Sequence, residues 1–366
     1  MPEQPARRSF QTLDGLRGVG AFLVVMRHVP GLFGPIRVPE SFLAVDLFYL
    51  VSGFVVAHAY GERLYAGGFV WGFVKTRIIR LYPLYLVGLL AGVIMAAASM
   101  LADPHSFWTP MKVVECVAVG LLMIPRFPGL DINGTTLNGP IWTLLYELIA
   151  NFVYAVAIRL LTTWVLLGIV VVCGAGVIFA EFHYGTLDVG YNLTDQWAAL
   201  TRVGFSFFAG VLIYRWFGTR EFKSVWAAWA CVAVLGLALA IHLPGGLIPV
   251  YEIGMVLVGM PLIAIAAGHF EPDPLSGRLF SFVGLISYGV YIVHQPLGNL
   301  AVMELRRFGP IPSGLSGVLY GLVFMAFLVL LNWALDVFYD APVRRVLRAI
   351  FMPARPAPAT AKASAP

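Results

Sequence analysis

Residues 163–181 read TWVLLGIVVVCGAGVIFAE, and no charged side chain interrupts this run before Glu181. About 18 apolar residues in helical form are enough to cross the hydrocarbon core of a bilayer. Several runs of this length recur along the chain, which has 60% hydrophobic and only 12% charged residues. An ordinary soluble domain carries roughly 25% charged residues, so this chain lacks the polar groups to cover its surface in water. The sequence therefore predicts an integral membrane protein with the lipid bilayer as its main solvent.

Hydropathy and helix-breaking residues divide the chain into about ten transmembrane helices, so we expect an all-α, polytopic membrane helix bundle. The predicted spans are 12–29, 41–60, 79–101, 140–160, 163–181, 197–217, 225–242, 247–268, 279–301 and 315–338. The segment 112–124 is apolar but short, and prolines bracket it. It fits an interfacial or re-entrant piece, or an eleventh crossing.

The distribution of basic residues predicts the orientation of the bundle. With the N-terminus in the cytoplasm, the cytoplasmic segments hold Arg7, Arg8, Arg63, Lys75, Arg77, Arg80, Arg215, Arg220, Lys223, Arg344, Arg345 and Arg348. The opposite side receives Glu181, Asp188, Asp195, Lys112, Arg306 and Arg307. This balance favours a cytoplasmic location for both ends (N-in, C-in), and it favours ten spans over eleven.

We expect one membrane domain over residues 1–350, followed by a Pro/Ala-rich cytoplasmic tail over residues 351–366 that is disordered. The net charge of +5 is explained by arginines next to membrane helices, so it does not indicate a nucleic-acid partner. The sequence contains no phosphate-binding loop, no HExxH or GxSxG motif and no Cys/His metal spacing. No metal site is therefore expected.

The first predicted helix carries the densest set of ionisable residues. Such residues cost roughly 2.5–3.5 kcal/mol at a helix centre on insertion scales, so each is a candidate functional position. Asp14 and Arg17 lie three residues apart and can pair on one face. His28 follows Arg17 by eleven residues, which returns to nearly the same face about 16 Å further along the helix. These residues would line one wall of a cavity; alternatively, Arg17 snorkels to the interface and His28 caps the helix there.

The second and fourth spans each contain a carboxylate. Asp46 needs a partner inside the membrane, and the nearest candidates are an arginine or a histidine of the first helix. Ser52 lies on the same span, although the pair Ser52-Gly53 also fits close helix packing. Glu147 lies about a third of the way into the fourth span. We expect Glu147 to partner His28 or to position a hydroxyl group.

The segment KTRIIRLYPLY places Arg77 and Arg80 three residues apart, just ahead of the third span. The forked guanidinium group of arginine matches phosphate oxygens, so the pair is a candidate phosphate clamp. Basic residues at this place also satisfy the positive-inside rule without any further role. The spacing alone does not separate these two interpretations.

The ninth span, LISYGVYIVHQPL, forms one polar stripe that contains Ser287, Tyr288, Tyr291 and His294. The stripe extends about 10 Å along the helix axis. An interfacial aromatic belt is the alternative interpretation, but a belt would place its residues at one depth. The stripe therefore favours a functional surface inside the bundle.

These segments resemble, in order and over nearly the whole chain, the motifs of the acyltransferase-3 family of integral membrane O-acyltransferases. LDGLRGVGAFLVVMRH, with Arg17 and His28, resembles the opening helix, and AVDLFYLVSGFVV resembles the second-helix motif. KTRIIRLYPLY resembles the basic segment, and IWTLLYELIANFVY, with Trp142 and Glu147, resembles the tryptophan–glutamate stretch. ISYGVYIVHQPL resembles a late helix of the family. YDAPVRRVLR resembles its closing element, except that Asp340 stands where a glutamate is expected.

The resemblance implies a membrane acyltransferase that takes an acyl group, usually acetyl, from cytoplasmic acyl-coenzyme A as the donor. It implies transfer to a hydroxyl of a carbohydrate or glycolipid acceptor, commonly on the extracytoplasmic side of a bacterial inner membrane. Such a reaction modifies a polysaccharide or related glycan by O-acetylation. We expect Arg77 and Arg80 on the donor side, and His28, Glu147 and His294 towards the opposite side.

The resemblance and the residue chemistry together assign roles. His28 is the expected general base, because a neutral imidazole can take a proton near pH 7. Glu147 or Asp46 would orient it, and Asp14 with Arg17 would shape the donor channel. Arg77 and Arg80 would hold the coenzyme A phosphates. The remaining expected substrate-binding residues are Ser52, Trp142, Tyr288, Tyr291 and His294.

A transporter or exporter of a sugar derivative is the rival class, because charges inside a membrane also mark substrate and proton pathways. Transporters often contain paired halves with interrupted helices, and the two halves of this sequence show no such repeat. A structural or receptor-like protein would leave the aligned Asp14, Arg17 and His28 unexplained. The sequence therefore favours the enzyme.

Overall fold

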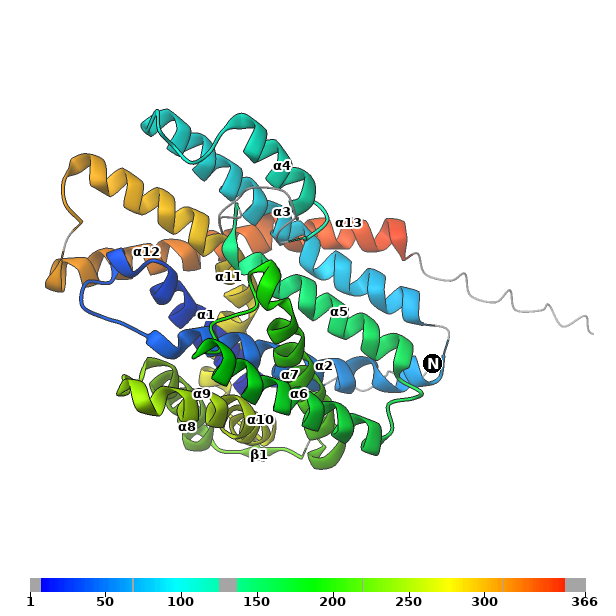
Figure 1. Ribbon diagram of the computed structural model, residues 1–366. Helices are drawn as coiled ribbons and strands as arrows, with labels where there is room; N and C mark the ends of the chain where they lie inside the picture. Colours follow the sequence, from blue (N-terminus) through cyan, green and yellow to red (C-terminus); the bar gives the residue numbers. More distant parts are fainter. Residues whose placement is uncertain (1–7, 68, 125–136, 219, 312, 353–366) are drawn as a thin grey trace, which may run out of the picture.

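The computed structural model describes residues 8–67, 69–124, 137–218, 220–311 and 313–352, and it confirms the all-α prediction (Figure 1). The helices are α1 (Gln11–His28), α2 (Ala44–Tyr65), α3 (Val70–Ala102), α4 (Pro110–Gly120), α5 (Trp142–Ala157), α6 (Thr163–Tyr184), α7 (Gln196–Phe217), α8 (Val225–Ala240), α9 (Ile248–Gly254), α10 (Met260–His269), α11 (Pro274–Phe308), α12 (Gly314–Leu335) and α13 (Ala341–Phe351). Within the described ranges, the strands are β1 (Phe222–Lys223) and β2 (Phe270–Glu271), which pair in parallel.

All ten predicted spans are helical, and eight helical segments are long and apolar enough to cross a membrane. The other two are α1, which carries three charged residues, and α8, which has 16 residues. A π-helical turn at Met255–Gly259 joins α9 to α10, and a second one at Asp336–Asp340 joins α12 to α13. Each pair therefore forms one continuous helical segment.

The segment 112–124 corresponds largely to α4, which has 11 residues. Its length of about 16 Å is half of a hydrocarbon core, so α4 is too short for an eleventh crossing. It packs beside α3, where the Tyr82 hydroxyl donates a 2.8 Å hydrogen bond to the Leu121 carbonyl. Most of the predicted tail, residues 353–366, lies outside the described residues.

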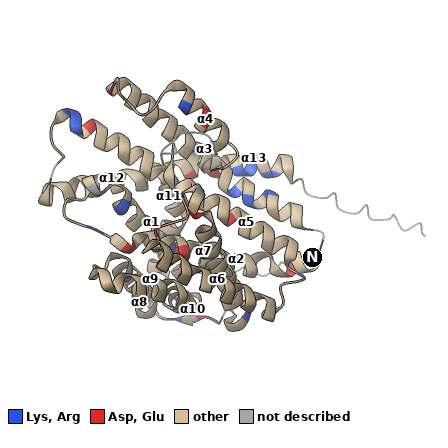
Figure 2. Cartoon of the chain, in the orientation of Figure 1, with Lys and Arg blue, Asp and Glu red and all other residues tan. Residues whose placement is uncertain are grey.

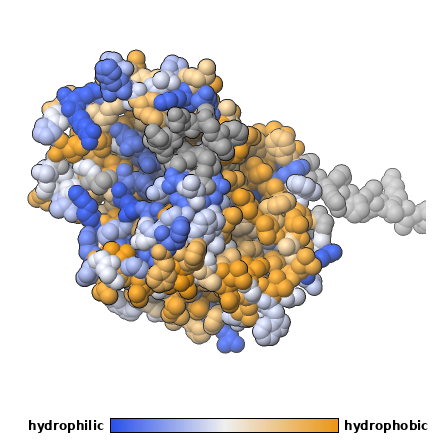
Figure 3. Space-filling model, in the orientation of Figure 1, coloured by the Kyte–Doolittle hydropathy of each residue, from blue (hydrophilic) through white to orange (hydrophobic). Residues whose placement is uncertain are grey.

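The helices differ sharply in how much of their surface the bundle covers. The apolar windows of α2 and α7 are 72% and 78% buried, whereas that of α6 is 28% buried. On α6 the side chains of Val171, Val172 and Phe182 are more than half exposed. Figure 3 shows broad hydrophobic areas on the visible face. Because apolar side chains at this density are unfavourable in water, α6 faces lipid while α2 and α7 form the centre.

Two glycines let the central helices α2 and α7 touch through their backbones. A Cβ atom on Gly53 would lie 1.9 Å from the Phe207 carbonyl oxygen, and one on Gly210 would lie 2.0 Å from the Leu50 carbonyl oxygen. No side chain fits at either position. The packing interpretation of Gly53 is therefore confirmed, and this contact fixes how α2 and α7 present their polar residues.

The starts of α1 and α3 lie at one end of the bundle, because Phe10 before α1 packs against His58 near the end of α2, and α2 leads directly into α3. Arg8, just before α1, donates to the carbonyl of Gly268 near the end of α10. Lys75, near the start of α3, donates to the carbonyl of Phe351 at the end of α13. Figure 2 shows the basic (blue) positions of α13 beside α3. This arrangement agrees with an even number of crossings between α1 and α13.

Candidate active site

Helix α1 supplies the ion pair that the sequence predicted. Arg17 Nη1 lies 3.5 Å from Asp14 Oδ1, and both side chains are partly buried. Helix α11 packs along the same face, because a Cβ atom on Gly284 would lie 2.4 Å from the Cβ of Asp14. The pair therefore faces a neighbouring helix.

A cavity lies between α1, α2, α3, α5 and α11, with about 790 Å³ of empty space when its mouth is included. Its polar and aromatic lining comprises Arg17, Tyr49, Ser52, Arg77, Arg80, Thr143, Glu147, Ser287, Tyr288, Tyr291 and Phe48. Five helices thus bring seven of the predicted site residues together in one place. We call this space the arginine cavity.

Glu147 is held in the arginine cavity by α2 and α3. Its Oε1 accepts a 2.7 Å hydrogen bond from Ser52 Oγ and forms an ion pair with Arg77 Nη2. Arg77, which is 5% exposed, also contacts Ser52 Oγ at 3.3 Å. The expectation that Glu147 partners His28 in the outer half is wrong, because a carboxylate bonded to Arg77 must lie at the depth of Arg77. Ser52 therefore faces the cavity while Gly53 packs against α7.

Arg80 is the third guanidinium group of the cavity. It makes no hydrogen bond or ion pair with any other described residue, and its side chain is only partly buried. The cavity lining contains three arginines and one carboxylate, and Asp14 adds a second negative charge beside Arg17. The site therefore carries surplus positive charge, which in a low-dielectric surrounding attracts anions.

The polar stripe of α11 faces the bundle interior. Ser287, Tyr288 and Tyr291 line the arginine cavity. The Tyr288 hydroxyl donates to the Leu81 carbonyl at 2.7 Å, and the Tyr291 hydroxyl lies 3.0 Å from Thr143 Oγ1. An aromatic belt at the membrane interface would leave these residues at the surface of the bundle. The interpretation of the stripe as such a belt is therefore wrong.

His28 and His294 form a separate pair of imidazoles between α1 and α11. Their ring centroids are 5.0 Å apart. The arginine cavity is not lined by His28, although Tyr291, which does line it, has its ring centroid 6.0 Å from that of His294. The expectation that Asp14, Arg17 and His28 line one cavity wall is therefore wrong, because only Arg17 lines the arginine cavity. Tyr291 lies where the cavity approaches the imidazole pair.

The protonation pattern of His28 follows from its backbone contact. Its Nδ1 lies 2.9 Å from the Val24 carbonyl oxygen. A carbonyl only accepts hydrogen bonds, so Nδ1 carries the hydrogen and Nε2 carries a lone pair in the neutral ring. The expectation that Glu147 or Asp46 orients His28 is wrong, because both carboxylates bind arginines elsewhere. The Val24 carbonyl holds the ring instead.

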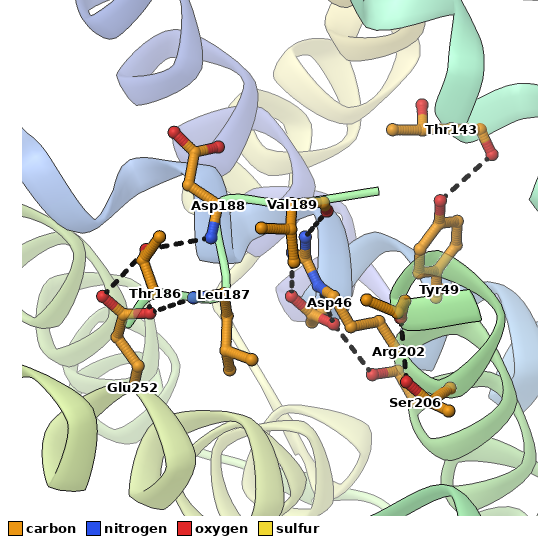
Figure 4. A network of polar contacts seen from close by, with 12 residues as sticks. Asp46, Tyr49, Thr143, Thr186, Leu187, Asp188, Val189, Arg202, Ser206 and Glu252 are labelled. Carbon is orange, nitrogen blue, oxygen red and sulfur yellow. Dashed lines mark hydrogen bonds and ion pairs between the residues drawn. The ribbon is translucent and has the colours of Figure 1, made fainter. Parts of the chain in front are cut away.

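Asp46 binds an arginine that the sequence reasoning missed (Figure 4). Arg202 of α7 reaches both carboxylate oxygens, with Nη2–Oδ2 at 2.5 Å and Nε–Oδ1 at 3.3 Å. Its Nη1 donates to the Val189 carbonyl at 2.8 Å. A partner from the first helix was expected for Asp46, and this is wrong, because α2 packs most closely on α7. The signal was present, since Arg202 is an ionisable residue inside the predicted span 197–217.

The loop between α6 and α7 is held by residues of α9, α1 and α7, the last through the contact of Arg202 with the Val189 carbonyl. Glu252 of α9 accepts hydrogen bonds from the Leu187 N–H at 2.5 Å and from Thr186 Oγ1, as Figure 4 shows. Asp188 forms a 2.5 Å ion pair with Arg27, the residue before His28. The loop therefore borders the imidazole pair, and Glu252 and Arg27 are further polar residues to which the sequence reasoning gave no role.

Two further predicted positions lie away from the arginine cavity lining. Trp142 begins α5 and packs against Tyr146, with ring centroids 5.9 Å apart. Asp340 is buried in the π-helical turn before α13 and pairs with Arg344 at 2.8 Å. The shorter carboxylate at position 340 therefore still reaches an arginine on its own helix. Among the described residues, no group of three His, Cys, Asp or Glu side chains could hold a metal ion.

Comparisons with known proteins agree with this architecture. The family model described as "Acyltransferase domain" matches residues 10–337. "Protein 2 in picA locus" of Rhizobium radiobacter is 41% identical over 165 residues, which are 42% of this chain and 85% of that protein. No solved structure matches the chain. Because the family match includes α1 to α12 and the whole arginine cavity, this integral membrane protein belongs to the acyltransferase-3 family.

Proposed function

We propose that the protein is an O-acyltransferase of a bacterial inner membrane that moves an acyl group, acetyl in the simplest case, from cytoplasmic acyl-coenzyme A to a hydroxyl of a carbohydrate or glycolipid. The observation that carries the proposal is the arrangement along α1. A cavity with surplus positive charge surrounds Arg17, and an imidazole with a free Nε2 stands at the end of the same helix.

The arginine cavity is the proposed donor site. Coenzyme A carries a diphosphate and a further phosphate, and arginine binds phosphate oxygens through charge-assisted hydrogen bonds. Arg80 is available for this contact because no described residue occupies its guanidinium group. Arg77 is fixed in position by Glu147 and Ser52, which lowers the entropy cost of using its remaining N–H groups.

The spacing on α1 fits an elongated donor. Eleven residues separate Arg17 from His28, about 16 Å along the helix axis. The pantetheine arm of coenzyme A is a long flexible chain that places its thioester far from its phosphates. Phosphates bound near Arg17 and Arg80 would therefore leave the thioester free to approach His28, with Tyr291 and Phe48 along the intervening wall.

The proposed reaction is a direct acyl transfer. His28 Nε2 takes the proton from the acceptor hydroxyl as its oxygen attacks the thioester carbonyl carbon. The bond between that carbon and sulfur breaks, and the leaving thiolate takes the proton from His28 Nε2. An ester, free coenzyme A and the neutral imidazole result. The Val24 carbonyl keeps the hydrogen on His28 Nδ1, which leaves Nε2 as the acceptor atom throughout.

The proposed sidedness follows from the two ends of the bundle. The end that carries the starts of α1 and α3 and the end of α13 is rich in basic residues, which favours the cytoplasm. His28 lies at the opposite end of α1. We therefore place the donor phosphates in the cytoplasmic half and the acceptor in the extracytoplasmic half.

The purified full-length protein in detergent with labelled acetyl-coenzyme A tests this function. Thioester consumption that depends on an added surface polysaccharide, with label appearing as an ester on it, is expected. Reconstituted vesicles provide the opposing measurement. Sugar flux across the membrane without any loss of thioester would contradict the proposal and support a transporter.

A further inference from the structure

A second imidazole, His294 on α11, lies beside the proposed base His28. The two ring centroids are 5.0 Å apart, with an angle of 57° between the ring planes. His294 has 0% exposure, and its Nε2 has no hydrogen-bond partner among the described residues. Buried polar atoms in proteins nearly always have a partner. This free nitrogen therefore points to a group that binds here during the reaction.

Both imidazoles have the same protonation pattern. His294 Nδ1 lies 2.8 Å from the Tyr291 carbonyl oxygen and 3.2 Å from that of Val290. His28 Nδ1 contacts the Val24 carbonyl in the same way. Because carbonyls only accept, each neutral ring carries its hydrogen on Nδ1 and a lone pair on Nε2. Each Nε2 thus points away from its own helix, and two lone pairs cannot bond to one another.

A ligand that satisfies both rings must bring two hydrogen-bond donors close together. We propose that the acceptor is a vicinal diol and that His294 binds its second hydroxyl while His28 acts on the first. This inference rests on the proposed acyl transfer and adds the class of acceptor. Neighbouring hydroxyls on a sugar ring supply two donors at short separation, which a simple alcohol cannot.

The chemistry at the two hydroxyls differs. The first hydroxyl gives its proton to His28 Nε2, and its oxygen forms the bond to the acyl carbon as the bond from that carbon to sulfur breaks. The second hydroxyl keeps its proton and donates a hydrogen bond to His294 Nε2. No bond to the second oxygen forms or breaks. His294 is therefore a substrate-binding residue that fixes which hydroxyl faces the thioester.

The surroundings of the imidazole pair suit a polar acceptor. Arg27 directly precedes His28, and its ion pair with Asp188 is partly exposed, at 28% and 37% for the two side chains. On the other side, Tyr291 lies one helical turn before His294 and lines the arginine cavity. The imidazoles thus lie between a charged, partly exposed surface and the proposed donor site.

Two small probe alcohols test the inference with the purified protein and labelled acetyl-coenzyme A. Trans-1,2-cyclohexanediol and cyclohexanol differ by one hydroxyl. We expect wild type to favour the diol by roughly tenfold in kcat/KM, the value of one hydrogen bond. His294→Asn keeps an amide near the backbone carbonyl but lacks an acceptor at the Nε2 position. It should lose this preference through a higher KM for the diol.

His294→Gln and His269→Asn are the matched variants. Glutamine places an amide oxygen near the Nε2 position, so it should restore much of the preference. His269 contacts the Ile265 carbonyl through Nδ1 at 2.7 Å, as the two site histidines contact theirs, but its Nε2 already faces the Phe217 carbonyl. His269→Asn should therefore leave the preference unchanged.

The outcomes separate this inference from the proposed function. Equal use of both alcohols by wild type keeps the acyltransferase and overturns the diol site, whatever the variants do. The same holds if wild type acetylates a polysaccharide but neither alcohol, or if His294→Asn lowers kcat alike for both alcohols. Absence of acceptor-dependent thioester consumption with the polysaccharide and with both alcohols contradicts the acyltransferase itself.

Discussion

Asp46 on α2 and Arg202 on α7 form a buried bidentate ion pair, with side chains 1% and 2% exposed. Removing one partner of such a pair leaves an uncompensated charge, so Asp46→Asn should lower the free energy of unfolding by roughly 3–5 kcal/mol. Thermal unfolding in detergent measures the change. Adding Arg202→Gln should recover part of the loss, and an additive double variant would show that the pair does not interact.

The half-exposed pair Glu304–Arg307 is the control for this comparison. Its N–O distance is 3.2 Å, but both side chains are 50% exposed. Glu304→Gln should change stability by no more than about 1 kcal/mol, because solvent screens exposed pairs. Similar losses for Asp46→Asn and Glu304→Gln would contradict the burial argument.

The contact between α2 and α7 at Gly53 should not tolerate a side chain. Gly53→Ala forces the backbones apart, because its Cβ would lie 1.9 Å from the Phe207 carbonyl oxygen. We expect a loss of about 1–3 kcal/mol, the usual cost of overpacking. Gly168→Ala on lipid-facing α6 meets nothing within 4 Å and is the matched control. Unfolding in detergent should separate the two variants, and equal stability would refute the close contact.

Arg80→Gln should weaken donor binding with little effect on the fold, because Arg80 makes no hydrogen bond or ion pair with another described residue. The expected rise in KM for acetyl-coenzyme A is roughly tenfold to a hundredfold, the worth of a hydrogen bond to a charged group. Steady-state kinetics at fixed acceptor concentration measures it. Arg345→Gln on the exposed face of α13 should leave KM unchanged, and parallel effects of both variants would indicate nonspecific attraction.

His28→Asn should lower acyl transfer by roughly 10²–10⁴-fold, the usual contribution of a general base. Asparagine keeps an amide near the Val24 carbonyl, so the amount of folded protein in the membrane should not change. The label transferred per minute at saturating donor is the measurement. Turnover at the wild-type rate would remove His28 from the mechanism.

Glu271 makes stability depend on pH at the end of the bundle that carries Arg8. Burial raises the pKa of Glu271 to about 6, from its usual 4.5, although Arg8 opposes the shift. The folded state binds this proton more tightly, so the contribution of Glu271 is most favourable below pH 4.5 and is lost as pH rises to about 6. The change is at most about 2 kcal/mol. In the Glu271→Gln variant, the unfolding temperature should depend less on pH between 4.5 and 6 than in wild type. The same pH dependence in both proteins would show that Glu271 is not the titrating group.

Local properties of the sequence were enough to predict the helices and part of the site. Hydropathy and helix-breaking residues located the ten spans, because a bilayer demands about 20 apolar residues wherever a chain crosses. Helical spacing alone predicted the Asp14–Arg17 pair and the inward stripe from Ser287 to His294, because each set lies on one helix. These relationships need no knowledge of neighbouring helices.

The partners of the remaining ionisable residues were decided by tertiary structure. Asp46 meets Arg202, Glu147 meets Arg77, and His28 meets His294, each across helices that are distant in sequence. Several cations could satisfy a buried carboxylate at similar cost, so composition does not select one. The choice follows from which helices pack together, and that depends on contacts such as Gly53 against Phe207 that involve the whole bundle.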